Sequence, residues 1–246
     1  MARLDKKKFL PMLNKFKLKN YLFAIVIVLA VIQCTTPRTE MNKHWKNYNT
    51  AVSNGDIATA IVEVNSIYAF DTTNQAVLDT LSRLYFISGN SYGAFNTTKR
   101  INNKSRDQKM IMAESALQIG MQGEAKALFT ELNDADTSGS FIGIKYKLAT
   151  LHFSDKEYEK AIALLNEVTL HDNSMTQTTR VKVGDNSFQD VSLYAASWNF
   201  AGYIQLLNGD LAAAEEYFNE ALRAQPNFAL AKNNLVLLNQ EKNKKD

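Results

Sequence analysis

The sequence is short of the residues that usually cross-link or interrupt a chain. It has one cysteine, so no disulfide can form within it. Three prolines and ten glycines in 246 residues leave room for long uninterrupted helices. It also lacks an HExxH pair, paired cysteines and a glycine-rich phosphate loop, the usual signatures of zinc proteases, thiol metal sites and nucleotide sites. We therefore expect no metal site and no cofactor.

Positive charge is scarce outside the N-terminus. Residues 1–20 carry seven Lys and Arg against one Asp, and residues 21–33 carry no charge. Without residues 1–33 the chain has 21 basic and 24 acidic residues, a net charge of −3, and no long basic run. Because nucleic-acid binding requires a basic surface, we expect no nucleic-acid partner.

The N-terminus has the order of a secretory leader. A basic stretch is followed by the apolar run YLFAIVIVLAVIQ over residues 21–33 and then by Cys34. A helix of about 13 residues spans roughly 20 Å, which is less than the ~30 Å hydrocarbon core of a bilayer. We interpret residues 1–33 as a signal peptide or membrane anchor and residues 34–40 as a tether.

The placement of Cys34 resembles the lipobox of bacterial lipoproteins, in which the cysteine is lipidated and becomes the mature N-terminus. That family usually has Gly, Ala or Ser before the cysteine, whereas this chain has Gln33. The resemblance implies lipidation of Cys34 and attachment to a membrane in the cell envelope, facing the periplasm. An uncleaved N-terminal anchor and a cleaved soluble protein are the alternatives.

The stretch WNFAGYIQLLNGDLAAAEEYFNEALRAQP, residues 198–226, places large and small residues at fixed offsets. This pattern resembles the tetratricopeptide repeat (TPR), a helix–turn–helix unit of about 34 residues. The resemblance implies that Gly202 and Ala214 face each other where the two helices come closest. Gly209 is expected to end the first helix in the left-handed conformation, and Asp210 to cap the second.

Earlier segments repeat the combination of a turn with a following alanine. These alanines are Ala60, Ala94, Ala125, Ala161 and Ala214. Their spacings are 34, 31, 36 and 53 residues. The sequence therefore predicts an all-α TPR solenoid of about five repeats over residues 41–240, which includes a C-terminal capping helix, and a tail over residues 241–246.

The last spacing exceeds 34 residues by 19, which places an insertion at about residues 175–194. Its segment TTRVKV alternates β-branched and polar residues and precedes a turn signal at residues 184–186, as in a β-hairpin. Ser187 and Asp190 instead fit a capping box, which would start a lengthened helix reaching Trp198. Such insertions map to loops that often carry binding, although a plain surface loop is the simpler interpretation.

No group of polar residues in the sequence suggests catalysis. His152 falls where the TPR family packs a large residue, so we expect a packing role for it. We therefore expect a non-enzymatic protein without catalytic residues.

The TPR resemblance implies a binding surface on the concave face of the array. The family's groove positions fall on Trp45, Arg83, Phe86, Tyr146, Phe153, Asn199 and Tyr203. This mostly aromatic set favours a protein or peptide partner held in the groove.

The first functional hypothesis is an envelope-anchored adaptor or scaffold that mediates protein–protein interaction. The alternatives are a lipoprotein that binds a glycan or peptide, with Trp45, Tyr146 and Tyr203 as stacking platforms, and a subunit of an outer-membrane assembly complex. Glycan binding predicts tight polar clusters beside the aromatic rings. Partner binding predicts a broad apolar patch.

Overall fold

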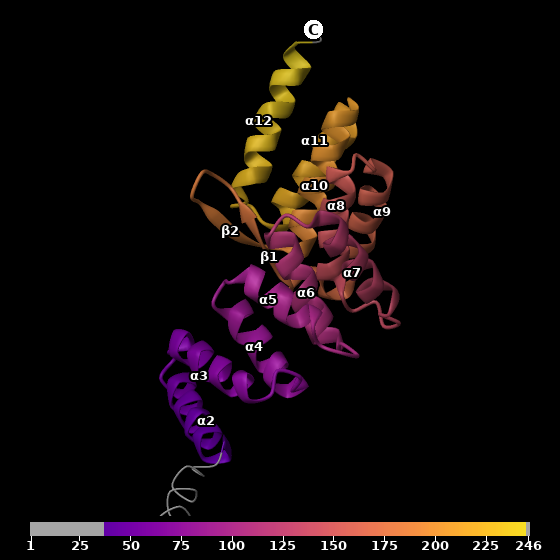
Figure 1. Cartoon of the computed structure of the whole chain (residues 1–246). Helices are drawn as coiled ribbons and strands as arrows, with labels where there is room; N and C mark the ends of the chain where they lie inside the picture. The colour runs from indigo at the N-terminus through magenta and orange to yellow at the C-terminus, as the bar shows by residue number, and fades with distance from the viewer. Residues whose placement is uncertain (1–36, 245–246) are drawn as a thin grey trace, which may run out of the picture. The chain divides into compact units, whose positions relative to one another are not determined.

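The computed structural model describes residues 37–244, so the predicted leader and Cys34 lie outside the described residues. Within this range the chain forms eleven α-helices, one 3-10 turn and one two-stranded hairpin (Figure 1). None of these helices combines the length and apolar character needed to cross a membrane. The all-α prediction is confirmed, and the hairpin is a local addition to it.

The described chain divides into two compact units, the first ending at Asn102 and the second beginning at Asn103. The first unit holds the helices α2 (Pro37–Ser53), α3 (Ile57–Phe70), α4 (Gln75–Ile87) and α5 (Ser91–Lys99). Helix α2 begins within the segment expected as a tether. Helix α5 is only 9 residues long, which accounts for the spacing of 31 residues between Ala94 and Ala125. The core of the first unit consists of Ala51, Ala60, Val64, Ile67, Val77, Leu81 and Leu84.

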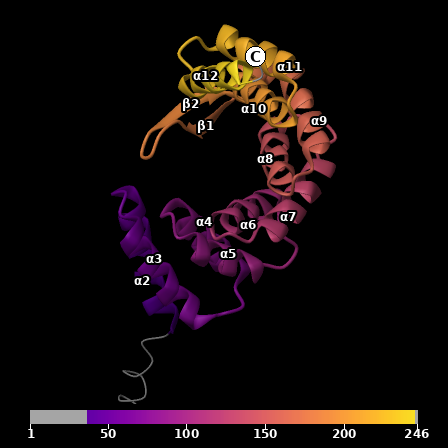
Figure 2. The same cartoon turned by 90° about the horizontal axis from the view of Figure 1, so that it is seen from above.

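The second unit holds three helical hairpins and a final helix. These elements are α6 (Arg106–Gln118), α7 (Gln122–Asp134), α8 (Ile142–Ser154), α9 (Tyr158–Thr169), α10 (Leu193–Asn208), α11 (Leu211–Ala224) and α12 (Ala229–Asn243). Within this unit α8 and α10 lie on the inner side of the curve and α9 and α11 on the outer side (Figure 2). Helices α8 and α10 therefore form the concave face of this unit.

The turns between paired helices require a left-handed residue, as the sequence indicated. Gly209 has φ 82° and ends α10, and the Asp210 side chain accepts a hydrogen bond of 3.0 Å from the Ala213 N–H. In the turn between α8 and α9 a lysine takes the place of the glycine, because Lys156 has the left-handed conformation with φ 62°. Both caps expected in the last repeat are thus present.

The alanines that set the repeat register, Ala60, Ala94, Ala125, Ala161 and Ala214, are all fully buried. Ala214 is not the closest neighbour of Gly202, although the sequence predicted that these two residues form the tightest contact between the helices. The atoms nearest to a side chain at Gly202 belong to Phe218 and Tyr217. The ring of Phe218 fills the narrow space between α10 and α11. Because a side chain at residue 202 would collide with this ring, glycine fits there.

The insertion folds as a β-hairpin after a 3-10 turn, η1 (Asp172–Met175). Strands β1 (Thr178–Lys182) and β2 (Phe188–Ser192) pair antiparallel, with Arg180 opposite Asp190. The capping box expected at Ser187 and Asp190 is therefore wrong. Val191 in the same strand is fully buried, and this burial favours the strand over a helical turn. Helix α10 begins only at Leu193, with the Ser192 hydroxyl accepting from the Ala195 N–H at 3.1 Å.

Candidate functional site

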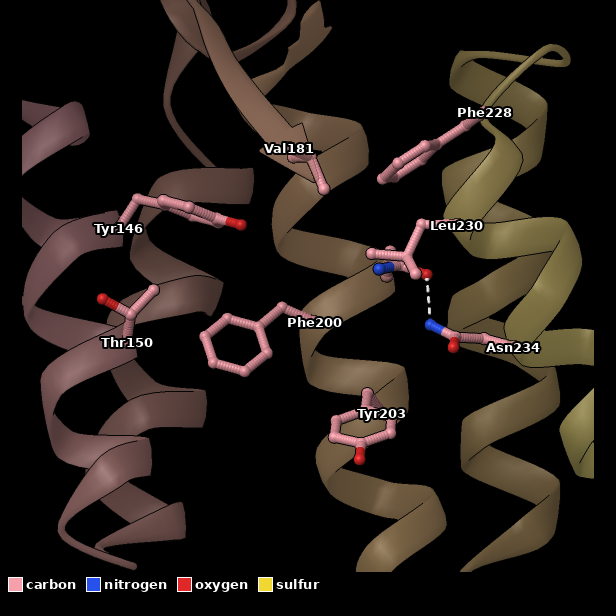
Figure 3. Close-up of a pocket in the computed structure, with 9 residues that line it drawn as sticks. Tyr146, Thr150, Val181, Phe200, Tyr203, Phe228, Leu230 and Asn234 are labelled. Carbon is pink, nitrogen blue, oxygen red and sulfur yellow. Dashed lines mark hydrogen bonds between the residues drawn. The ribbon is translucent and has the colours of Figure 1, made fainter. Parts of the chain in front are cut away.

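A pocket of about 390 Å³ lies in the second unit between α8, α10, α12 and the hairpin strand β1 (Figure 3). Its lining is mostly apolar and is contributed by residues far apart in the sequence. The lining residues are Tyr146, Thr150, Val181, Asn199, Phe200, Tyr203, Phe228, Leu230 and Asn234.

The wall between α8 and α10 is a cluster of interlocked aromatic rings. The Phe200 ring centroid lies 6.2 Å from that of Tyr146 and 5.1 Å from that of Phe153, both in edge geometry. The Tyr203 ring lies 6.1 Å from Phe153. Because each ring contacts the next, this wall is formed without a ligand.

Two asparagines form the polar floor of the pocket. The Asn234 side-chain N–H donates to the Asn199 carbonyl at 2.8 Å, and the residues are only 8% and 4% exposed (Figure 3). The remaining groups, the Asn199 amide nitrogen and the Asn234 carbonyl, have no hydrogen-bond partner among residues 37–244. One donor and one acceptor are thus left for a ligand.

Tyr146 adds a further polar group to the apolar wall, and its hydroxyl points into the pocket (Figure 3). Burial raises the pKa of Tyr146 to about 12, so the hydroxyl stays protonated at physiological pH. It can therefore donate or accept one hydrogen bond, but it is not a general base.

Four of the residues predicted for the groove lie together in the second unit. Tyr146, Asn199 and Tyr203 line the pocket, and Phe153 supports it through its ring contacts. The structure therefore brings these four predicted residues together at one pocket.

The other predicted groove residues belong to the first unit. Trp45 packs against the core of that unit and meets the Tyr48 ring edge-on at 5.4 Å. Arg83 pairs with Asp79 on the same helix at 3.1 Å, and Phe86 is 40% exposed.

Several pocket residues escaped the sequence analysis. Phe200 lies beside Asn199 but outside the groove positions of the family, and Val181 and Phe228 come from the insertion and from the loop before α12. Only the alternation of valines in the insertion carried a signal, because it marks a strand with one buried face. The rest depends on tertiary contacts.

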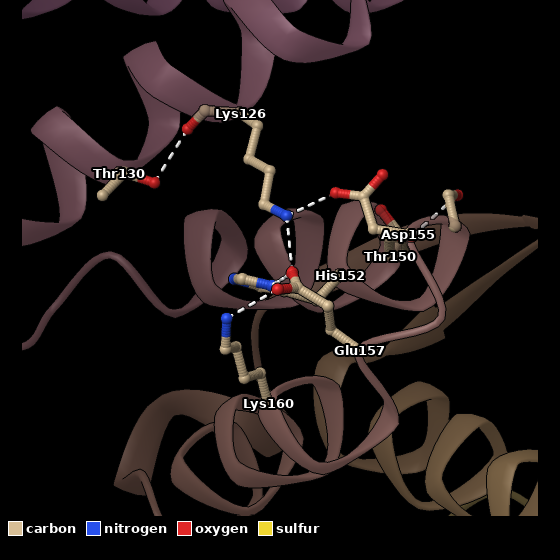
Figure 4. Close-up of polar contacts among 8 residues, drawn as sticks. Lys126, Thr130, Thr150, His152, Asp155, Glu157 and Lys160 are labelled. Atoms are coloured by element: carbon tan, nitrogen blue, oxygen red, sulfur yellow. Dashed lines mark hydrogen bonds and ion pairs between the residues drawn. The ribbon is translucent and has the colours of Figure 1, made fainter.

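A second polar cluster joins α7 to the turn between α8 and α9 (Figure 4). Lys126 reaches both Asp155 and Glu157, and Glu157 also binds His152 and Lys160, each at 2.6 Å. The hydrogen bonds from Lys126, Lys160 and His152 hold the pKa of Glu157 well below its usual range. His152, expected to pack, is partly buried and pairs with this carboxylate.

This cluster links α7 to the turn between α8 and α9 through ion pairs. Its carboxylate is kept ionised by three cationic or hydrogen-bonding partners, and Lys126 is engaged by two carboxylates at once. A group held in one charge state by so many partners is a poor proton carrier near neutral pH.

The comparisons with known proteins agree with this architecture. Residues 195–228 match the tetratricopeptide repeat family. No curated protein sequence matches the chain.

Solved structures show the same fold at low sequence identity. The chain resembles the crystal structure of MamA with 18% identity and a TM-score of 0.58, over 73% of this chain and 94% of that one. It resembles MamA from Desulfovibrio magneticus RS-1 with 11% identity and a TM-score of 0.58, over 77% and 97%. It resembles YrrB, described as a TPR protein with an unusual peptide-binding site, with 12% identity and a TM-score of 0.60, over 76% and 87%.

Residues 195–228 are therefore a tetratricopeptide repeat, and the described chain has the fold of a TPR solenoid. The repeat match coincides with α10 and α11, and so with the part of the pocket that holds Asn199, Phe200 and Tyr203.

Proposed function

We propose that the protein is a non-enzymatic adaptor of the cell envelope that holds a segment of a protein partner in the pocket of the second unit. The observation that carries this proposal is the combination of an aromatic wall with a buried asparagine pair that lines the same pocket and has one donor and one acceptor left over. Peptide binding in YrrB, which shares the fold, is consistent with it.

The apolar wall supplies the affinity in this proposal. Phe200, Tyr203 and Tyr146 are preformed contact surfaces of the kind that dominate protein interfaces. A pocket of about 390 Å³ accommodates one or two side chains of a partner, rather than a folded domain. We therefore expect the partner to present an apolar anchor on an exposed segment.

The asparagine pair supplies the polar recognition. The free Asn199 amide nitrogen can donate to a backbone carbonyl, and the free Asn234 carbonyl can accept from a backbone N–H. The N–H and C=O of one extended residue of the partner, which lie on the same edge of a strand, would satisfy both. The polar groups beside the rings are few, whereas a glycan would need a dense polar cluster, so the pocket favours a peptide over a glycan.

Attachment to the membrane is the second part of the proposal, and it rests on the sequence around Cys34. Mass spectrometry of the purified mature protein should show loss of residues 1–33 and an added acyl mass. The Cys34→Ser variant should be released from membranes. If that variant keeps its leader and remains membrane-bound like the wild type, an uncleaved anchor is the correct interpretation.

Site-specific photo-crosslinking in intact cells tests the pocket. A photoreactive residue in place of Thr150, which lines the pocket, should capture a protein partner. The same residue in place of Thr130, an exposed threonine of α7, is the matched control and should not.

Replacing one ring then tests whether the wall holds the partner. Tyr203→Ala should weaken capture at Thr150 by roughly 30-fold, equivalent to ~2 kcal/mol. Tyr92→Ala, at a tyrosine that is 71% exposed, should leave it unchanged. Equal capture by the two variants, with unchanged helical circular dichroism, would contradict the proposed site.

A further inference from the structure

The hydrogen-bond pattern of the hairpin shows which backbone groups its strands leave unpaired. The Leu193 N–H donates to the Gln177 carbonyl at 2.8 Å, and the Val183 N–H donates to the Ser187 carbonyl at 2.9 Å. Antiparallel strands alternate between hydrogen-bonded and non-hydrogen-bonded residue pairs. The backbone N–H and C=O groups of Thr179 and Val181 therefore point towards β2. The N–H and C=O groups of residues 178, 180 and 182 therefore point away from β2.

The outer edge of β2 is already covered by the loop between α11 and α12. The Ser192 N–H donates to the Gln225 side-chain carbonyl at 3.2 Å, and the Gln225 amide donates to the Asp190 carbonyl at 3.3 Å. The Gln189 side chain binds the backbone of Asn227 and Ala229 at 2.9 and 3.0 Å. This edge has no room for another strand.

The outer edge of β1 is open. No residue between 37 and 244 hydrogen-bonds the outward backbone groups of Thr178, Arg180 or Lys182, and all three residues are exposed. The hairpin projects from the helices of its own unit (Figure 2). An open edge of this kind is a template for an added strand.

Charge indicates which strand fits this edge. Arg180 and Lys182 are the ionisable residues of β1, and both are basic. The Arg180 side chain also lies 3.4 Å from the Asp190 carboxylate of β2, so Lys182 carries most of the charge that a partner would meet. Antiparallel pairing of β1 with a second copy of itself about Arg180 would place like charges opposite each other, which is unfavourable. An acidic strand would place carboxylates opposite these two side chains instead.

The face of β1 that carries the Val181 side chain borders the pocket. Val181 faces inward between Arg180 and Lys182 and forms part of the pocket lining. In an added strand, side chains on the inner face would lie beside Val181, and those on the outer face beside Arg180 and Lys182. Edge and pocket would thus bind one continuous segment.

We propose that β1 binds an extended acidic segment of the partner as a third strand, with its apolar side chains facing the pocket. This inference rests on the proposed function, because it assigns the conformation and charge of the segment that the pocket holds. Backbone hydrogen bonds to β1 supply affinity, and the alternation of acidic and apolar side chains supplies specificity.

Synthetic peptides test the charge and the alternation with the full-length protein. Glu-Val-Glu-Phe-Glu-Val-Glu should bind, as measured by isothermal titration calorimetry. Its block rearrangement Glu-Glu-Val-Phe-Val-Glu-Glu and its lysine counterpart Lys-Val-Lys-Phe-Lys-Val-Lys should bind at least about tenfold more weakly. The protein variant Lys182→Glu should reduce this preference for glutamate over lysine.

N-methylation of the peptide tests the strand pairing itself. In the antiparallel arrangement the glutamate residues share a face with Arg180, so their N–H groups point towards β1. Methylating the amides of the glutamates should abolish binding. Methylating those of the valines and phenylalanine, which point away, should preserve it.

Thr178→Pro removes one outward donor from the protein without touching the pairing of β1 with β2, because Thr178 is the first residue of the strand. Peptide affinity should fall about fivefold, the equivalent of one net hydrogen bond. Thr178→Val keeps the N–H group and should bind like the wild type. Equal affinity of the two variants would overturn the proposed strand pairing.

Two further outcomes separate this inference from the proposed function. If no peptide binds while crosslinking at Thr150 still captures the partner, the edge proposal fails and the pocket proposal remains. If the wild type forms a dimer that Thr178→Pro abolishes in sedimentation experiments, the edge belongs to a second copy and the inference is overturned.

Discussion

Gly202 determines how closely α10 and α11 can approach in the last repeat. A Cβ atom here would lie 2.8 Å from Cδ1 and Cε1 of Phe218 and 3.2 Å from Cβ of Tyr217. Since the Phe218 ring is fully buried in a dense core, it cannot move away without cost. We expect Gly202→Ala to lower the free energy of unfolding by ~1–3 kcal/mol, as measured by urea denaturation.

Gly123 provides the matched control for this substitution. It lies in α7, and no atom is within 4 Å of a Cβ built on it. Because alanine is a better helix former than glycine, Gly123→Ala should raise stability by roughly 0.5–1 kcal/mol. If both variants lose the same stability, the assigned packing of Gly202 is incorrect.

Glu157 should give the protein a specific acid sensitivity. Its pKa is lowered in the folded chain by Lys126, Lys160 and His152, from an ordinary value of about 4.5. A carboxylate with a lowered folded-state pKa stabilises the fold above its unfolded pKa, and this contribution is lost as the pH falls. Glu157→Gln should therefore lower the melting temperature at pH 7.

The difference between this variant and the wild type should shrink as the pH falls below about 4.5. Glu216→Gln, at an exposed residue of α11, is the control, and its melting temperature should follow that of the wild type across the range. A difference for Glu157→Gln that stays constant with pH would show that the ion pairs do not contribute.

At the scale of elements, the sequence predicted the helical hairpins well because their turns are local. A glycine such as Gly209 and a cap such as Asp210 encode a turn within a few residues, and the buried alanines repeat with it. The second strand of the insertion was missed because Ser187 and Asp190 also fit a capping box. Burial of Val191, a tertiary effect, decided between the two.

The candidate site was only partly predictable for the same reason. Tyr146, Asn199 and Tyr203 follow from their positions in the repeats. Val181 and Phe228 reach the pocket only because the hairpin and the last helix pack over α10, and no local pattern encodes that packing. Sequence reasoning thus located the scaffold side of the pocket and missed the side that closes it.

The Gln225 side chain links strand β2 of the hairpin to the end of helix α11. Its side chain accepts from the Ser192 N–H and donates to the Asp190 carbonyl. Gln225→Ala should speed amide hydrogen exchange at Ser192 about fivefold, the equivalent of one hydrogen bond. The Val191 N–H, which faces β1, should keep its protection.

Gln118→Ala serves as the control for this experiment, because Gln118 is an exposed glutamine at the end of α6. It should leave exchange in the hairpin unchanged. If Ser192 exchanges at the wild-type rate in Gln225→Ala, the loop between α11 and α12 does not cover the β2 edge in solution.

At the scale of the whole molecule, the two units differ in what they need to be stable. The first unit has two helical hairpins, and the second has three together with the helix α12. Helix α12 buries Ala231, Leu238 and the hydrogen-bonded Asn234, and its other polar residues cover the end of the array, as in a terminal cap. Because a TPR hairpin cannot bury its apolar face alone, about three repeats are needed for a stable array.

We therefore expect the second unit to fold alone and the first to be marginal alone. A fragment of residues 103–246 should show a cooperative thermal transition by far-ultraviolet circular dichroism, because its core includes Phe129, Phe218 and Phe228, all fully buried. A fragment of residues 37–102 should show reduced helicity and a broad transition.

In the fragment of residues 103–246, Leu238→Asp should lower the melting temperature, because it buries a charge in the helix α12 that caps the array. If residues 103–246 alone are unfolded, their stability depends on the first unit, and the division into two independent units is incorrect.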